Sequence, residues 1–241
     1  YDMIQGEDKG QARNLLADYI TEQGTIDPVI TSEWKITNVP FENKFTDVTE
    51  EDWFHDVVLE LAASGVVNGM TETTFEPQGT LTRAEFATML YRVSYAPVVT
   101  GESTYSDVKT GDWYYDAVVW ATEAGVVNGM GDGTFAPNDN ITRQEMAKIM
   151  AKYLNWKGLD TTPSSEISSY PINDLNAIGG GALEPVCFCY EQGLLNGRGS
   201  NFAPQANATR AEACVVLCRL QKYVDAQSAQ PAAAEPAALA G

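Results

Sequence analysis

One order of short motifs occurs three times in this chain of 241 residues. An Asn-Gly step is followed by a Phe-x-Pro loop and then by a Thr-Arg-x-Glu segment. The Asn-Gly steps stand at 68–69, 128–129 and 196–197, and the arginines at 83, 143 and 210. Such a recurrence is very unlikely by chance and indicates internal repeats. A repeat of about 50 residues is too small to bury its apolar faces alone, so the three must share a core.

Each repeat is predicted to hold two helices with the Asn-Gly loop between them. In the first repeat, the first helix carries apolar residues at helical spacing, and Ser64-Gly65 is a typical C-terminal cap. The spacing of Thr142 and Glu145 is that of a capping box, so the second helix is predicted to begin at the arginine. The sequence therefore predicts an all-α fold in which three helix-loop-helix repeats form a compact pseudo-threefold domain, with the second helices near the axis.

The arginine at the first helical position has the wrong charge for that end of the helix dipole. Free amides, the dipole and the guanidinium would all favour an anion, so the sequence predicts an anion site at Arg83, Arg143 and Arg210. The alternative is a solvated arginine that pairs with a neighbouring carboxylate. Changing all three arginines to alanine is expected to leave the helices intact. The motif glutamates are assigned to capping, and Asp47, Asp107 and Asp174 to capping or tethering loops.

Composition excludes several functions. The net charge of −18 argues against a nucleic-acid partner, which requires a basic surface. No apolar run of about 18 residues is present, so no membrane span is predicted. His55 is the only histidine and no catalytic arrangement is supported, so this segment is predicted not to be an enzyme and to need no cofactor. The chain begins at Tyr1 without a signal pattern and is interpreted as a mature or trimmed segment. The favoured interpretation of the full-length protein is a catalytic or structural domain before residue 1, with this segment as its anchor.

The four cysteines all lie in the third repeat, at positions 187, 189, 214 and 218. Cys189 aligns with Ala121, and Cys214 aligns with Ala87 and Ala147, so small apolar positions explain both. Packed thiols are the favoured interpretation, ahead of a Cys189–Cys214 disulfide between the helices of the repeat. A metal site is the least favoured, because structural zinc sites commonly use Cys-x-x-Cys pairs.

The repeats are bounded by segments that do not match them. Residues 1–44 are interpreted as a lead-in or as the tail of a preceding domain, with a helical pattern at 11–23. The repeats span 45–97, 105–157 and 170–224. Residues 225–241 are rich in alanine and proline and are predicted to be a disordered tail.

Together, these motifs resemble the S-layer homology domain. The resemblance covers about residues 45–224 and is carried by Phe/Tyr-x-Asp-Val, Trp-Phe/Tyr, Gly-Val-Val-Asn-Gly-Met, Phe-x-Pro and Leu/Ile-Thr-Arg-x-Glu. It implies three repeats around a central three-helix bundle. It also implies non-covalent anchoring outside the cell to a secondary polysaccharide attached to peptidoglycan, commonly one with pyruvylated N-acetylmannosamine. The alternative is a self-assembling or protein-docking module of a surface layer, with neighbouring surface-layer proteins as partners.

In this family the motif arginine contributes to a ligand groove between repeats, a role that would fall to Arg83, Arg143 and Arg210. For the glycines the favoured role is turn formation, and for the tryptophans it is core packing, over sugar contact. The other candidate ligand-binding residues are Asn68, Gly69, Asn128, Gly129, Asn196, Gly197, Trp53 and Trp113. The third repeat has a shortened loop, and it has Gly180 at the position where the other two repeats have a tryptophan. The first repeat has Thr71–Thr74 in place of the glycine-rich loop of the second. The site assignment is therefore strongest at Arg143.

Overall fold

The computed structural model describes residues 42–228. The chain divides into two units, Tyr1–Glu42 and Asn43–Gly241, and all helices that the structure describes lie in the second. The helical pattern at 11–23 and residues 229–241 of the predicted tail lie outside the described residues.

Six α-helices and no strands form the described part of the chain, so the all-α prediction is confirmed. The first helices of the three repeats are α2 (His55–Ala63), α4 (Tyr115–Glu123) and α6 (Leu183–Glu191). The second helices are α3 (Arg83–Val93), α5 (Arg143–Trp156) and α7 (Arg210–Ser228). Short 3-10 turns, η1 (Ile167–Ser169) and η2 (Leu175–Ala177), precede α6. Because α7 continues to Ser228, the segment predicted as a tail from 225 begins inside this helix. None of the helices in 42–228 is long and apolar enough to cross a membrane.

The second helices begin where the capping pattern predicts. In α3 the Thr82 hydroxyl accepts a hydrogen bond from the Glu85 amide at 3.2 Å, and the Glu85 carboxylate accepts one from the Thr82 amide at 2.7 Å. The same reciprocal box opens α5 at Thr142 and Glu145. Pro185 lies in the first turn of α6, where the missing amide of a proline costs nothing.

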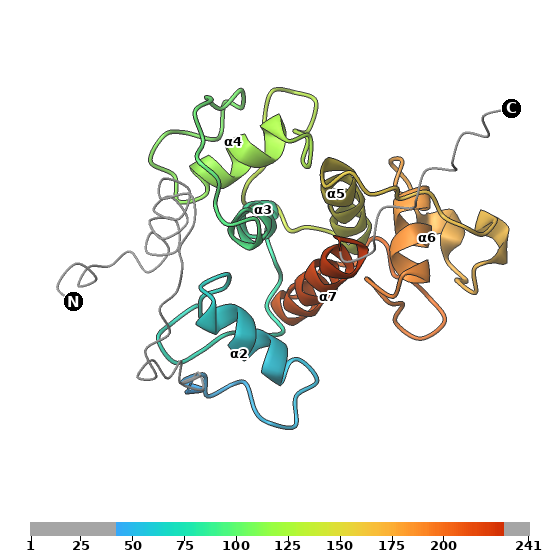
Figure 1. Cartoon of the computed structure of the whole chain (residues 1–241), viewed down its shortest axis with the longest axis horizontal. Helices are drawn as coiled ribbons and strands as arrows, with labels where there is room; N and C mark the ends of the chain where they lie inside the picture. Colours follow the sequence, from blue (N-terminus) through green and yellow to red (C-terminus); the bar gives the residue numbers. More distant parts are fainter. Residues whose placement is uncertain (1–41, 229–241) are drawn as a thin grey trace, which may run out of the picture. The chain divides into compact units, whose positions relative to one another are not determined.

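The two helices of a repeat do not pack mainly on each other. Each first helix packs on the second helix of the preceding repeat: α4 on α3, α6 on α5 and α2 on α7 (Figure 1). In Figure 1, α3, α5 and α7 lie toward the middle of this unit, with α2, α4 and α6 outside them. The apolar face of each repeat is therefore covered by a neighbour, as expected of units too small to fold alone. A threefold axis through the second helices remains a prediction.

A closed ring of backbone hydrogen bonds joins the three repeats just before their second helices. The amide of Leu81 donates to Ala208 at 3.0 Å, Ala208 to Ile141 at 2.9 Å, and Ile141 back to Leu81 at 2.9 Å. These three residues are fully buried. Because a buried amide must find an acceptor, each repeat depends on both others to satisfy its backbone.

All four cysteines are free and buried, in agreement with packed thiols. Cys189 lies against α5 of the second repeat, where its thiol approaches the Ala147 carbonyl at 3.8 Å. Among residues 42–228 there is no cluster of histidine, cysteine or carboxylate side chains that could hold a metal ion.

The thiols are expected to be inert in the folded protein. Burial raises the pKa of Cys189 and of Cys214 to about 12, so both stay protonated at pH 8, and only the thiolate attacks a disulfide reagent. We predict no reaction of these thiols with dithionitrobenzoate at pH 8 in native protein and complete reaction in guanidinium chloride. A rapid reaction of Cys189 or Cys214 in the native state would contradict this packing.

Candidate functional site

The Phe-x-Pro loop of each repeat is held by an aspartate at the start of the repeat. In the first repeat, the Asp47 carboxylate accepts hydrogen bonds from the amides of Phe75 at 2.8 Å and Glu76 at 2.7 Å. Glu76 has a φ of 58°, an unfavourable conformation that these bonds stabilise. Asp107 and Asp174 hold the other loops in the same way. The predicted tethering role is confirmed, and it fixes the phenylalanine carbonyl.

That carbonyl is an acceptor for the motif arginine of the preceding repeat. Arg143 donates from Nε to the Phe202 carbonyl at 3.0 Å and from Nη2 to the Asn196 carbonyl at 2.5 Å. Its Nη1 pairs with Glu212 at 2.8 Å, and the guanidinium lies 5.0 Å from the centre of the Phe202 ring. Only 2% of Arg143 is exposed. The guanidinium thus joins the second repeat to the third.

The other two arginines repeat this pattern around the molecule. Arg83 of the first repeat donates to the Phe135 and Asn128 carbonyls of the second, and Arg210 of the third donates to the Phe75 and Asn68 carbonyls of the first. Both are buried, and each faces the capping glutamate of the repeat it contacts, at 3.7 and 3.4 Å. The glutamates therefore cap a helix and also pair with an arginine from another repeat.

The premise of an anion site at the helix start is wrong, because the amides there are not free. The amide of Arg143 donates to the Ala206 carbonyl and that of Gln144 to the Pro204 carbonyl, both from the third repeat. The equivalent amides at the starts of α3 and α7 also donate to carbonyls of a neighbouring repeat. Of the alternative, the pairing with a carboxylate is found for all three arginines, but they are buried and not solvated.

The glycine of each Asn-Gly step is required by packing inside the repeat. A Cβ at Gly69 would lie 2.5 Å from the Thr71 carbonyl and 2.7 Å from the Phe45 ring. A Cβ at Gly129 would meet the Tyr105 ring, and one at Gly197 would lie 2.7 Å from the Asn201 carbonyl. The preceding asparagine carbonyl is thereby held where the arginine can reach it, which supports the favoured role of turn formation.

Three equivalent grooves lie between the Asn-Gly loops and the second helices. Each is named here by the repeat that supplies its loop, and their volumes are about 190, 260 and 240 Å³ for grooves 1, 2 and 3. The candidate residues of groove 1 are Asn68, Gly69, Arg210 and Trp113; those of groove 2 are Asn128, Gly129 and Arg83; those of groove 3 are Asn196, Gly197, Arg143 and Trp53. The structure thus brings every candidate residue into a groove.

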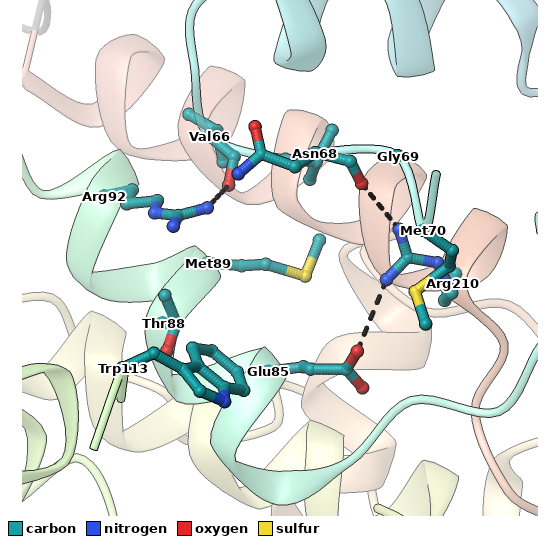
Figure 2. Close-up of a pocket in the computed structure, with 11 residues that line it drawn as sticks. Val66, Asn68, Gly69, Met70, Glu85, Thr88, Met89, Arg92, Trp113 and Arg210 are labelled. Atoms are coloured by element: carbon teal, nitrogen blue, oxygen red, sulfur yellow. Dashed lines mark hydrogen bonds and ion pairs between the residues drawn. The ribbon is translucent and has the colours of Figure 1, made fainter. Parts of the chain in front are cut away.

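Figure 2 shows how groove 1 is built from all three repeats. The loop with Asn68 and Gly69 forms one side, and α3 supplies Met89, which lies between the loop and Glu85, together with Glu85 and Thr88. Arg210 of the third repeat closes one end through its bonds to Asn68 and Glu85. Trp113 of the second repeat stands on the side opposite the loop (Figure 2).

The prediction that Trp53 and Trp113 are core residues is wrong. They are 63% and 64% exposed, and each makes an edge-on contact with the aromatic residue that follows it, Phe54 or Tyr114. That neighbour is buried, so the core residue at this point is Phe54 or Tyr114 and not the tryptophan. An indole left in water beside a groove offers a large apolar surface to a ligand.

A second basic residue in each groove was missed by the sequence analysis. Nine residues after the motif arginine stand Arg92, Lys152 and Arg219, which line grooves 1, 2 and 3. Nine residues are two and a half helical turns, so the two cations lie on opposite faces of one helix and enter different grooves. The fixed spacing from the arginine was a signal that could have revealed them.

These second cations make fewer hydrogen bonds and ion pairs with the described residues than the motif arginines do. Arg92 donates one hydrogen bond, to the Val66 carbonyl at 3.2 Å, and among the described residues none of the three has a carboxylate partner. Burial lowers the pKa of Arg92, and burial followed by the nearby charge of Lys148 lowers the pKa of Lys152. A cation that is partly desolvated and unpaired gains from an anionic ligand.

Comparison with known proteins agrees with this architecture. The family model of the S-layer homology domain matches residues 44–87, 104–147 and 171–214. The chain is 37% identical over 178 residues to an amylopullulanase of Thermoanaerobacterium thermosulfurigenes, which is 73% of this chain and 9% of that protein. It is 37% identical over 174 residues to exoglucanase XynX of Acetivibrio thermocellus, 72% of this chain and 16% of that one. With the S-layer protein sap of Bacillus anthracis it shares 30% over 191 residues, 77% and 22% of the two chains. The chain thus spans less than a quarter of each of these relatives.

Proposed function

The chain belongs to the S-layer homology domain family, and on that premise we propose that its three grooves bind an anionic cell-wall polysaccharide. The segment is a non-catalytic anchoring module of a cell-wall-associated surface protein. The finer proposal is that the ligand is a pyruvylated N-acetylmannosamine polymer attached to peptidoglycan. In the whole protein we expect the module to hold a further domain at the cell surface.

One observation carries the proposal: a partly desolvated, unpaired cation shares a groove with an exposed indole. Arg92 and Trp113 both line groove 1, and Arg219 and Trp53 both line groove 3. A pyruvyl ketal presents a carboxylate, which a guanidinium can bind through two parallel hydrogen bonds. The apolar face of the sugar ring would lie against the indole. The motif arginines take a positioning role here, because their donors are already used by the neighbouring repeat.

We expect one groove alone to bind the polysaccharide weakly, and several grooves together to bind it strongly. An exposed ion pair contributes about 0–1 kcal/mol, which alone does not retain a protein on a wall. Two or three grooves on one repeating polymer gain about 10² to 10⁴ in avidity where the geometry allows simultaneous contact. The module is therefore expected to need more than one working groove.

Binding to purified cell-wall sacculi tests the proposal. The module should sediment with intact sacculi and stay in solution after the polysaccharide has been removed by acid extraction. Retention on polysaccharide-free sacculi, or on surface-layer protein alone, would instead support the docking module.

Salt should affect retention in two opposite ways. The protein carries a net charge of −18, so an anionic polymer is repelled at long range and attracted only inside the grooves. Screening over about 10 Å at 0.1 M salt weakens the repulsion first, while screening over about 3 Å at 1 M also weakens the groove contacts. We predict that affinity for sacculi passes through a maximum as sodium chloride is raised. A steady rise up to molar salt would contradict the role of the groove cations.

A further inference from the structure

Groove 2 differs from the other two because two lysines face it from one side of α5. Lys148 and Lys152 are one helical turn apart and both line groove 2. The position of Lys148 is taken by Thr88 in α3 and by Val215 in α7, so the additional cation belongs to this groove alone. The lining of groove 2 holds three cationic side chains and one carboxylate, that of Glu145, which already faces Arg83.

A second cavity adjoins groove 2 across the same two lysines. This cavity, here called the α5–α6 hollow, has a volume of about 320 Å³ and is also lined by Lys148 and Lys152. Its other polar residues are Asn155, Asp160, Thr161, Thr162 and Glu184. These side chains donate and accept hydrogen bonds as sugar hydroxyls require.

The side of groove 2 that carries Lys148 is the side where the third repeat lacks a tryptophan. Gly180 stands where Trp53 and Trp113 occur in the other repeats, and the Lys148 ammonium donates to its carbonyl at 2.5 Å. A Cβ at Gly180 would lie 3.9 Å from that ammonium, so the lysine occupies the side of the groove where the other repeats carry an indole. Neither lysine has a carboxylate within ion-pair distance among the described residues.

We propose that groove 2 and the α5–α6 hollow form one extended site for two consecutive sugars of the wall glycan. The acidic sugar lies in groove 2 with its carboxylate at Lys148 and Lys152, and a neutral neighbour lies in the hollow against Asn155, Asp160 and Thr161. Grooves 1 and 3 hold only the acidic sugar, against their tryptophans. The proposal rests on the proposed function, because it takes the same anionic glycan as ligand. The burial-lowered pKa of Lys152 is in keeping with an anion at this position.

The test compares three synthetic probes by NMR titration of the full chain. They are the methyl glycoside of pyruvylated N-acetylmannosamine and the two disaccharides that add one neutral glucose on either side of it. The amides of Gly69, Gly129 and Gly197 report on grooves 1, 2 and 3. One of the disaccharides should bind at Gly129 about tenfold more tightly than the monosaccharide, which corresponds to one or two added hydrogen bonds. At Gly69 and Gly197 the added glucose should change affinity less than about twofold.

Two variants separate the parts of the site. Thr161→Trp fills the hollow and should remove the gain from the added glucose at Gly129; Asn155→Ala is a milder change at the same place. Lys152→Gln should weaken all probes at Gly129 by about fivefold, and the matched variant Arg219→Gln should do so only at Gly197. Equal affinity of mono- and disaccharides at Gly129 would overturn the extended site. Failure of every probe to shift any of the three glycines would instead overturn the proposed function.

Discussion

Replacing Arg143 with alanine is expected to lower the free energy of unfolding by about 3–5 kcal/mol. The substitution leaves the Phe202 and Asn196 carbonyls without their arginine donor and removes one of the two arginines that pair with the Glu212 carboxylate. These acceptors lie between two repeats, so the loss also loosens the join between the second and third. Urea denaturation followed by circular dichroism measures the change.

Arg198 provides the matched control, because it pairs with the same Glu212 carboxylate at 2.8 Å from an exposed position. Its side chain is 44% exposed, so Arg198→Ala should change stability by no more than about 1 kcal/mol. A loss for Arg143→Ala that is as small as the loss for Arg198→Ala would contradict the buried, inter-repeat role of the motif arginine.

The double variant Trp53→Ala with Trp113→Ala is expected to weaken binding to sacculi at least about 100-fold. It removes the exposed indole from two of the three grooves, and avidity on a repeating polymer is lost when only one groove stays complete. Both side chains are more than 60% exposed, so the fold should be unaffected. Sedimentation of labelled protein over a range of sacculus concentrations measures the loss.

Trp156→Ala is the control for this effect. Trp156 is 41% exposed, packs edge-on against Trp120 and lines none of the three grooves. It should leave sacculus binding unchanged. Comparable losses from Trp156→Ala and from the double variant would show that the tryptophans act through general surface hydrophobicity and not as parts of the grooves.

The stability prediction changes how the arginines can be tested. From the sequence, replacing Arg83, Arg143 and Arg210 together was expected to abolish wall retention and to leave the helices intact, because the three arginines were assigned to the ligand site. In the structure, each buried guanidinium donates to two backbone carbonyls of another repeat and faces a glutamate of that repeat. A loss of binding in such variants would report on folding, so the exposed tryptophans and second cations are the better test.

The sequence pattern was sufficient to predict the helices and the capped starts of α3 and α5, but not the starts of the first helices, which have no side-chain cap, nor which helices pack together. The capping pattern placed the start of α5 at Arg143, and the recurrence of Asp47, Asp107 and Asp174 predicted the tethered loops. Which helix covers which cannot be read from an apolar stripe, because the stripe is the same whether it meets its own repeat or the next. The packing of α4 on α3, of α6 on α5 and of α2 on α7 was therefore found only in the three-dimensional structure.

The same limit explains the errors at the site. Arg143 looked uncompensated because its acceptors, Phe202 and Asn196, are more than 50 residues away in sequence. Trp113 looked like a core residue because its size and helical spacing match those of one, yet Tyr114 takes the buried position next to it. The second cations were readable in principle from their constant distance to the motif arginine, but that spacing gains meaning only when each helix is known to border two grooves.

The central claim is that the glycan binds in the grooves between repeats, and the indole protons of the tryptophans test it most directly. Polysaccharide released from sacculi is added to nitrogen-15-labelled protein, and the side-chain signals of Trp53, Trp113 and Trp156 are followed. If the glycan binds in the grooves, the signals of Trp53 and Trp113 will shift together until binding saturates, while the signal of Trp156 will not shift. Tight binding of the polysaccharide with no shift at Trp53 or Trp113 would contradict that claim.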